Sequence, residues 1–311
     1  VASRGLGDVY KRQGVQQFGS VSVYLGEKSG KYPDGNQVVV MGSELSVAFD
    51  TPLVTRSLQG AIQDVQAVIL GHVHEDHMAG LKRFSQLPLW VHEGDLDAAQ
   101  SWEGMARHFG YAPAVLSVWH QRMQEDFDYQ PRPDAQAYGH HHVWELGGGV
   151  RVRAHHLPGH TSGHCALVVE SDGVAFIGDI DLTGFGPYYG DATSSLALFR
   201  RSLQEVRQLD ARVWVTSHHR GVITERALFE SSLQAFADQL DQRSDRLLTL
   251  LGAEPRSLTD LVTQRLIYPQ GYDAAFVDDV ERRMISQHLH ELVEAGRVTC
   301  VDPAQALYQR T

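Results

Sequence analysis

The first fifty residues alternate between apolar and polar positions in a way that is typical of β-structure. Residues 20–25 (SVSVYL) place an apolar side chain at nearly every second position, which predicts a strand with one buried face. A link rich in Gly, Pro, Asp and Asn at residues 30–36 leads to a second β-rich run at 37–41, and a third run follows at 45–50. The chain is therefore predicted to begin with a β-meander.

Later segments alternate between short apolar runs and helical spacing. Residues 65–70 (VQAVIL) form a nearly continuous apolar run that ends at Gly71, which is typical of a strand buried on both faces. A helix is predicted to begin near His77. Residues 95–135 are expected to be helical or irregular, a helix is predicted at 195–209, and strands are predicted at 88–92, 150–154, 165–170, 173–177 and 212–216. This mixture predicts a layered α/β or α+β fold.

From about residue 225 the pattern becomes helical. A long amphipathic helix is predicted over 225–251, a short one over 260–266, and a third over 274–294. Residues 296–301 are expected to form a small hairpin strand. Three helices followed by a β-wing is the order of a winged-helix module.

Composition and charge restrict the classes of protein to consider. A chain of 311 residues with 42% hydrophobic content can bury one large core and a smaller one. No run approaches the ~20 apolar residues that span a bilayer, so no membrane segment is expected. The net charge of −11 disfavours a protein that grips nucleic acid by neutralising phosphates. Two cysteines without CxxC spacing favour a reducing, cytoplasmic setting.

Residues 1–14 are expected to lie outside the folded domains. The chain begins at Val1 and has no apolar stretch of the kind found in a secretory signal. Residues 8–13 (DVYKRQ) look like a translated sequencing-library adapter. We therefore expect a non-native, disordered leader and a native start that is missing from the sequence.

Histidine is unusually frequent, and the positions of the 17 histidines carry the chemical argument. Residues 72–77 (HVHEDH) directly follow the buried strand, and the alternation of a strand aims His72 and His74 the same way. Asp76 and His77 fall on the following turn. Imidazoles and carboxylates are common metal ligands. Four ligand-type residues in six positions favour a metal site over a solvated loop.

Three further segments place ligand-type residues at the ends of predicted strands. Residues 156–164 (HLPGHTSGH) contain Gly159, which allows a sharp turn that directs His160 inward. Asp179 follows a strand and a glycine, and residues 213–219 (VWVTSHH) again place histidine after a buried strand. Each segment is weak evidence alone, but their shared position at strand ends indicates a single site.

These motifs together resemble those of the metallo-β-lactamase superfamily. The order is HxHxDH, PGHTxGH, a strand that ends in Gly-Asp, and a strand that ends in a turn containing histidine. The resemblance covers about residues 20–225. It implies a four-layer αββα sandwich over 15–225, followed by a small helical domain, similar to a winged helix, over 226–311. It also implies two divalent metal ions, zinc foremost, with manganese or iron as alternatives.

The same resemblance assigns a role to each motif residue. The first metal would be held by His72, His74 and His160, the second by Asp76, His77 and His218, and Asp179 would bridge the two. The last histidine of the family usually follows Pro-Gly, whereas this turn reads SHHRG. Either His218 or His219 is therefore the last ligand, and we favour His218. His164 resembles the family's structural histidine rather than a ligand.

The ligands indicate the chemistry. Two cations that share a water molecule lower its pKa toward neutrality, and they polarise a carbonyl or phosphoryl oxygen. Asp76 would also orient the hydroxide, while Glu75 is expected to point away from the metals. Tyr188 and Tyr189 follow Asp179 closely enough to reach the pocket. Either tyrosine would hydrogen-bond the substrate or polarise a leaving group there, and a packed aromatic turn is the equal alternative.

The predicted function is hydrolysis of a small ester, thioester or lactone by a metal-bridging hydroxide. One alternative is a phosphodiesterase or endoribonuclease that uses the same two metals. Another is a mononuclear iron persulfide dioxygenase, against which the full set of second-site residues argues. A third is a non-enzymatic nucleic-acid-binding protein that works through its winged helix.

The charge of the C-terminal region bears on these alternatives. Residues 226–311 contain nine arginines and no lysine against thirteen acidic residues, a net charge of −4. A winged helix that reads nucleic acid would have a basic face, so a nucleic-acid partner is not expected. Arg282 and Arg283 are interpreted as solvated charges. We expect a small-molecule substrate and a C-terminal module that covers the pocket or supports a homodimer.

Overall fold

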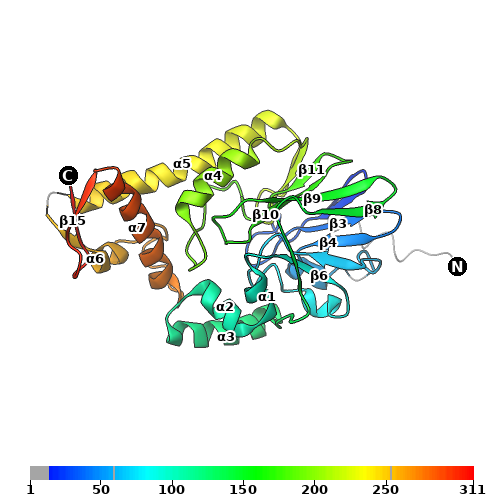
Figure 1. Cartoon of the computed structure of the whole chain (residues 1–311), viewed down its shortest axis with the longest axis horizontal. Coiled ribbons are helices and arrows are strands. Elements are labelled where there is room, and N and C mark those ends of the chain that lie inside the picture. Colours follow the sequence, from blue (N-terminus) through cyan, green and yellow to red (C-terminus); the bar gives the residue numbers. More distant parts are fainter. Residues whose placement is uncertain (1–13, 59, 253) are drawn as a thin grey trace.

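The computed structural model describes residues 14–58, 60–252 and 254–311, and its larger part is built on two β-sheets (Figure 1). The predicted leader therefore lies, except for Gly14, outside the described residues. The first sheet has seven strands in chain order: β1 (Val15–Phe18), β2 (Val21–Tyr24), β3 (Gln37–Met41), β4 (Ser46–Phe49), β5 (Ala67–Ile69), β6 (Leu89–His92) and β7 (Gln136–Tyr138). Strands β1 to β4 pair antiparallel, as the predicted meander requires, and β4 to β7 pair in parallel.

The second sheet has six strands. Their spatial order is β13 (Val222–Ile223), β12 (Val213–Val215), β11 (Val174–Phe176), β10 (Cys165–Val169), β9 (Val150–His156) and β8 (Val143–Gly147). Only the β11–β12 pair is parallel, and the other pairs are antiparallel. The predicted strands are thus confirmed, and the short β1, β7 and β13 were not predicted.

The two sheets pack face to face around a valine-rich core. In β2, Val21 and Val23 are fully buried between the sheets, whereas the alternate residues are partly exposed. In β4, Val47 and Phe49 face the second sheet, and Ala48 contributes to the core on the outer face. A strand covered on both faces needs apolar residues at every position, which explains the apolar run of β4.

Helices cover the outer faces of both sheets, so the predicted four-layer αββα sandwich is confirmed (Figure 1). On the side of the first sheet lie α1 (Leu96–Gln100), α2 (Trp102–Phe109) and α3 (Pro113–Phe127), together with the 3₁₀ helices η1 (Leu53–Arg56) and η2 (Leu81–Phe84). Helix α4 (Leu196–Val206) covers the second sheet. There the Trp214 ring stacks on Phe229, with ring centroids 4.3 Å apart.

The prediction of a helix that begins near His77 is wrong. Residues 72–80 form turns, and only η2 is helical in this region. The turns are fixed by Asp50, whose carboxylate accepts hydrogen bonds from Gly71 N and from His77 Nδ1, each 2.7 Å long. Glycine at position 80 further disfavours a helix through this segment.

The C-terminal region contains the three predicted helices and a small sheet. Helices α5 (Arg226–Leu251), α6 (Leu258–Thr263) and α7 (Val277–Glu294) accompany three strands in the order β14 (Arg256–Ser257), β16 (Leu307–Arg310) and β15 (Val298–Asp302). The first half of α5 packs on the main core, whereas its end forms a separate core with α6 and α7. The winged-helix assignment and the domain boundary at 225/226 stay predictions.

The strand ends that carry the ligand-type residues meet at one edge of the sandwich. Parallel β5 and the β11–β12 pair end there, and the segment between β9 and β10 turns at the same edge. In the part of the chain that the structure describes, no helix has the length and apolar character needed to cross a membrane.

Candidate metal centre

Three histidines from two segments form the first group at this edge. His72 and His74 follow β5, and His160 lies in the turn between β9 and β10. The Nε2 atom of His160 is 3.1 Å from Nδ1 of His74, and the His72 ring centroid is 4.7 Å from that of His160. All three side chains are buried. The first predicted trio is therefore brought together.

The second predicted trio is also brought together. His218 Nε2 is 3.0 Å from Asp76 Oδ2, and His77 Nε2 is 3.7 Å from the same oxygen. The three ligand atoms lie within 4.8 Å of one another. The neighbouring His219 is exposed, and its backbone has a φ of 59°. The turn therefore directs His218, and not His219, into this group.

Asp179 lies between the two groups. Its Oδ2 atom is 3.4 Å from His160 Nε2 and 4.0 Å from His72 Nε2. Its Oδ1 atom is 3.1 Å from His77 Nε2 and 3.5 Å from His218 Nε2. One carboxylate oxygen thus faces each trio, which is the arrangement a bridging ligand requires.

Hydrogen bonds to the far side of four rings fix which nitrogen faces the centre. His160 Nδ1 donates to the Tyr188 carbonyl over 3.0 Å, and His77 Nδ1 donates to Asp50. His218 Nδ1 donates to the carbonyls of Gly30 and Asp34, at 2.9 and 2.8 Å. His74 Nε2 is 2.7 Å from Asp191 Oδ2 and takes the same donor role. In a neutral imidazole the other nitrogen then carries a lone pair.

These lone pairs face one another and the carboxylates. Nε2 of His72, His77 and His218 and Oδ1 of Asp179 are buried and have no hydrogen-bond partner among the described residues. Acceptors held this close repel each other unless a cation lies between them, and buried polar groups without partners are costly. The donor set therefore fits divalent metal ions.

The surroundings shift the pKa values of the ligand-type histidines in different directions. In the first group, burial lowers the pKa of His74, but its hydrogen bond to Asp191 outweighs this effect and raises the pKa to about 9. Burial lowers the pKa of His160 to about 3 and that of His72 well below its usual value, so both imidazoles are neutral at physiological pH. Burial has the same effect on His77 and His218, but carboxylates that include Asp76 and Asp179 outweigh it and raise both pKa values well above the usual one. The field that favours a proton at the second group equally favours a metal cation.

Two other residues of the motifs have supporting positions. His164 Nδ1 donates to Leu157 O over 3.1 Å, and its Nε2 accepts from Asp179 N over 3.2 Å, so this ring braces the turn before Asp179. Glu75 accepts a 3.1 Å hydrogen bond from the Tyr32 hydroxyl.

The candidate metal centre forms the floor of a cavity of about 380 Å³. Besides ligand-type residues and the carboxylates of Glu75, Asp181 and Asp191, most of its wall consists of phenylalanine, tyrosine and tryptophan rings. The rings come from four parts of the chain: Tyr32, Phe109, Tyr111, Trp119, Phe185, Tyr188, Tyr268, Tyr272 and Phe276. The last three belong to the segment between α6 and α7, so the C-terminal region covers part of the cavity. Covering the pocket was one of the two roles predicted for this region.

The two predicted tyrosines lie in different surroundings. Tyr188 lines the cavity, and its hydroxyl donates to Asp191 Oδ1 over 3.1 Å. Tyr189 is fully buried and does not line the cavity. Its hydroxyl is 2.6 Å from His288 Nε2 and 3.2 Å from Arg243 Nη1, on helices α7 and α5. The structure therefore separates Tyr189 from the chemistry and gives it a packing role.

Several residues at the site had no sequence prediction. Asp191 belongs to no motif, and the C-terminal aromatic residues are more than ninety positions from His160. Asp50 lies at the end of a predicted strand, as Asp179 does. This position at a strand end is the sequence feature from which a role for Asp50 at the site could have been predicted. For Asp191 the sequence offers no comparable signal.

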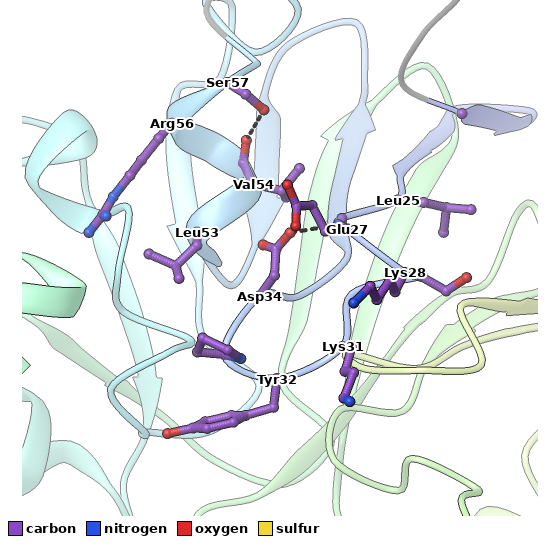
Figure 2. Close-up of a pocket in the computed structure, with 14 residues that line it drawn as sticks. Leu25, Glu27, Lys28, Lys31, Tyr32, Asp34, Leu53, Val54, Arg56 and Ser57 are labelled. Atoms are coloured by element: carbon purple, nitrogen blue, oxygen red, sulfur yellow. Dashed lines mark hydrogen bonds between the residues drawn. The ribbon is translucent and has the colours of Figure 1, made fainter.

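A second, open groove adjoins the cavity at Tyr32, which lines both hollows. Figure 2 shows Lys28 and Lys31 on one side of this groove and Leu53 and Arg56 on the other. Neither lysine has a carboxylate within 4.0 Å among the residues that the structure describes.

A family model and solved structures of known proteins indicate the same family for this chain. A family model described as "Metallo-beta-lactamase superfamily" matches residues 42–218. A solved metallo-beta-lactamase family protein from Thermus thermophilus is 25% identical, with a TM-score of 0.64 over 89% of this chain and 94% of that one. A beta-lactamase domain protein from Burkholderia ambifaria shares the fold, with 18% identity and a TM-score of 0.67 over 96% and 93% of the two chains.

Curated relatives are named as thioesterases. An atrochrysone carboxyl ACP thioesterase from Pseudocercospora fijiensis is 25% identical over 197 residues, which are 59% of this chain and 55% of that protein. One from Aspergillus terreus is 23% identical over 232 residues, or 71% and 59% of the two chains. The chain thus spans less than two thirds of the length of these relatives.

Proposed function

The chain belongs to the metallo-β-lactamase superfamily, and on that premise we propose that it is a two-metal hydrolase of a small thioester or a related ester or lactone. The ligands are those expected from the motifs: His72, His74 and His160 at one ion, Asp76, His77 and His218 at the other, and Asp179 at both. Zinc is the proposed metal, with manganese or iron as alternatives. The convergence of ring nitrogens from both trios on the two oxygens of Asp179 carries the proposal.

Divalent cations bound there would lower the pKa of water and polarise a carbonyl oxygen. The protein's own contribution is to position the reactants. Asp76 lines the cavity beside His218 and is proposed to accept a hydrogen bond from the attacking water. Tyr188 is a positioning residue, because its carbonyl holds His160 and its hydroxyl holds Asp191, which in turn holds His74.

The charges of the residues that line the cavity favour a substrate with a neutral acyl group. Its described lining contains no lysine or arginine and holds carboxylates that include Glu75, Asp181 and Asp191. A phosphodiester would meet these charges without a basic side chain to offset them, which disfavours the phosphodiesterase and endoribonuclease alternatives. The groove beyond Tyr32 offers space for the thiol or alcohol portion of a longer substrate.

The complete second trio supports two metals over a mononuclear iron dioxygenase. Asp76, His77 and His218 have the burial and mutual distances of a ligand set. The names of the relatives place thioesters first among the esters to be tested.

The test is a substrate panel with metal analysis on the same sample. We expect about two equivalents of divalent metal per chain and turnover of a thioester or lactone, but not of a phosphodiester or RNA. His74→Ala and Asp179→Ala should abolish turnover while circular dichroism stays unchanged, whereas His290→Ala, at an exposed position of α7, should have no effect. Unchanged turnover in His74→Ala or Asp179→Ala would exclude the proposal.

A further inference from the structure

The exposed aromatic side chains of this protein are concentrated at one place. Among the described large hydrophobic residues that are strongly exposed, three are aromatic: Tyr32 at 45%, Phe185 at 42% and Tyr272 at 44%. All three line the cavity above the metal centre. Exposed apolar side chains that gather at the mouth of a cavity mark a surface that a ligand covers.

Behind these residues, aromatic rings continue without a break from a metal ligand to the C-terminal region. Phe109 is parallel to the His74 ring, with centroids 6.0 Å apart, and it stacks on Tyr111 at 5.1 Å. Tyr111 in turn stacks on Phe276 at 6.0 Å. Phe276 is followed by Tyr268 and Tyr272, whose rings are 5.0 Å apart and nearly parallel. We call these phenylalanines and tyrosines, together with Phe185, the aromatic wall.

Residues 265–268, which carry Tyr268 of the aromatic wall, are held in place by hydrogen bonds. The buried carboxylate of Glu281 accepts hydrogen bonds from the backbone N–H groups of three successive residues, 266–268, at 2.8 to 3.0 Å. Arg246 donates to the carbonyls of Arg265 and Leu266, at 2.9 and 3.1 Å. A wall ordered before binding loses little conformational entropy when a ligand arrives.

From these observations we propose that the acyl group of the substrate is a flat aromatic ring system that packs on the aromatic wall. The C-terminal residues Tyr268, Tyr272 and Phe276 are then its specificity determinants. This inference rests on the proposed thioester or ester hydrolysis. Ring faces and edges offer a planar aromatic group stacking contacts that a flexible alkyl chain of equal size does not receive. A cavity of about 380 Å³ suits such a group.

The test compares two thioesters of N-acetylcysteamine, one with a 2-naphthoyl group and one with a straight-chain undecanoyl group of the same carbon number. We expect kcat/KM to be about tenfold higher for the naphthoyl thioester, mainly through KM. Tyr272→Leu keeps apolar bulk but removes the ring, and it should erase this preference. Tyr272→Phe should retain the preference, and so should the control Val293→Ala, on the exposed face of α7 away from the cavity.

A binding measurement separates this inference from the proposed function. Metal-free protein should bind the uncharged ketone 2-acetonaphthone, detected by calorimetry and by quenching of Trp119, and Tyr272→Leu should weaken that binding about tenfold. Binding without hydrolysis of any thioester or ester would contradict the proposed function but not the aromatic wall. Equal kcat/KM for both thioesters, or equal losses for both in Tyr272→Leu, would overturn the inference.

Discussion

Four histidines at the metal centre have one ring nitrogen hydrogen-bonded to a neighbour, so the other nitrogen is presented to the centre. His160 and His218 donate to backbone carbonyls and His77 donates to the buried carboxylate of Asp50, whereas the partner of His74 is a second buried carboxylate, that of Asp191. It is 2.7 Å from His74 and also accepts hydrogen bonds from the hydroxyls of Tyr111 and Tyr188. Asp191 therefore links a metal ligand to two residues that line the cavity.

This link predicts a defect in metal binding rather than in folding. Asp191→Asn removes the charge that orients His74 and supports its basicity, so we expect metal affinity to fall about tenfold. Competition with a chromogenic chelator measures this directly. Asp97→Asn, at an exposed carboxylate paired with Arg107, is the control and should leave the affinity unchanged. Equal affinity in Asp191→Asn and the wild type would show that Asp191 does not support the ligand.

At the scale of elements, helix α7 holds the loop that carries Tyr188 and Asp191. Arg283 donates to the carbonyls of Gly190 and Gly110, at 2.5 and 2.8 Å. Gln287 donates to the Tyr189 carbonyl at 3.0 Å and accepts from Leu196 N. The interpretation of Arg283 as a solvated charge is therefore wrong, because the helix turns this side chain toward the loop.

Two adjacent arginines on α7 allow a matched test of this contact. Arg283→Gln leaves partly buried carbonyls without their charged donor, and we expect a loss of about 2 kcal/mol in the free energy of unfolding, together with lower kcat/KM. Among the described residues, the side chain of the neighbouring Arg282 contacts only Thr259, over 3.4 Å, so Arg282→Gln should change neither quantity. Denaturant unfolding and steady-state kinetics of the two variants provide the comparison. Similar stabilities would contradict the role assigned to α7.

The strands and the motif residues were predictable because each is specified locally. A buried apolar run shows where a strand ends, and the ligand-type residue follows directly in the sequence, as His72 and Asp179 do. Orientation within a turn is not specified in this way. Tyr188 and Tyr189 are adjacent, yet one lines the cavity and the other packs against His288. The segment after residue 71 forms turns instead of a helix because the carboxylate of Asp50, from a distant strand, accepts hydrogen bonds from Gly71 N and from the His77 side chain.

At the scale of the whole molecule, the site is completed by parts that no single segment specifies. The sandwich supplies the proposed metal ligands, and the C-terminal region supplies Tyr268, Tyr272 and Phe276 to the wall above them. Contacts between such distant segments depend on tertiary packing, so the sequence could predict a C-terminal cover but not its aromatic residues.

The most direct test of the two-metal centre is a crystal structure of the zinc-loaded protein with anomalous diffraction measured at the zinc edge. We expect two anomalous peaks, one at about 2.0–2.2 Å from ligand atoms of His72, His74 and His160, and one at the same distance from Asp76, His77 and His218. Asp179 should contact both. A single peak, or peaks away from these residues, would contradict the two-metal centre on which the proposed chemistry depends.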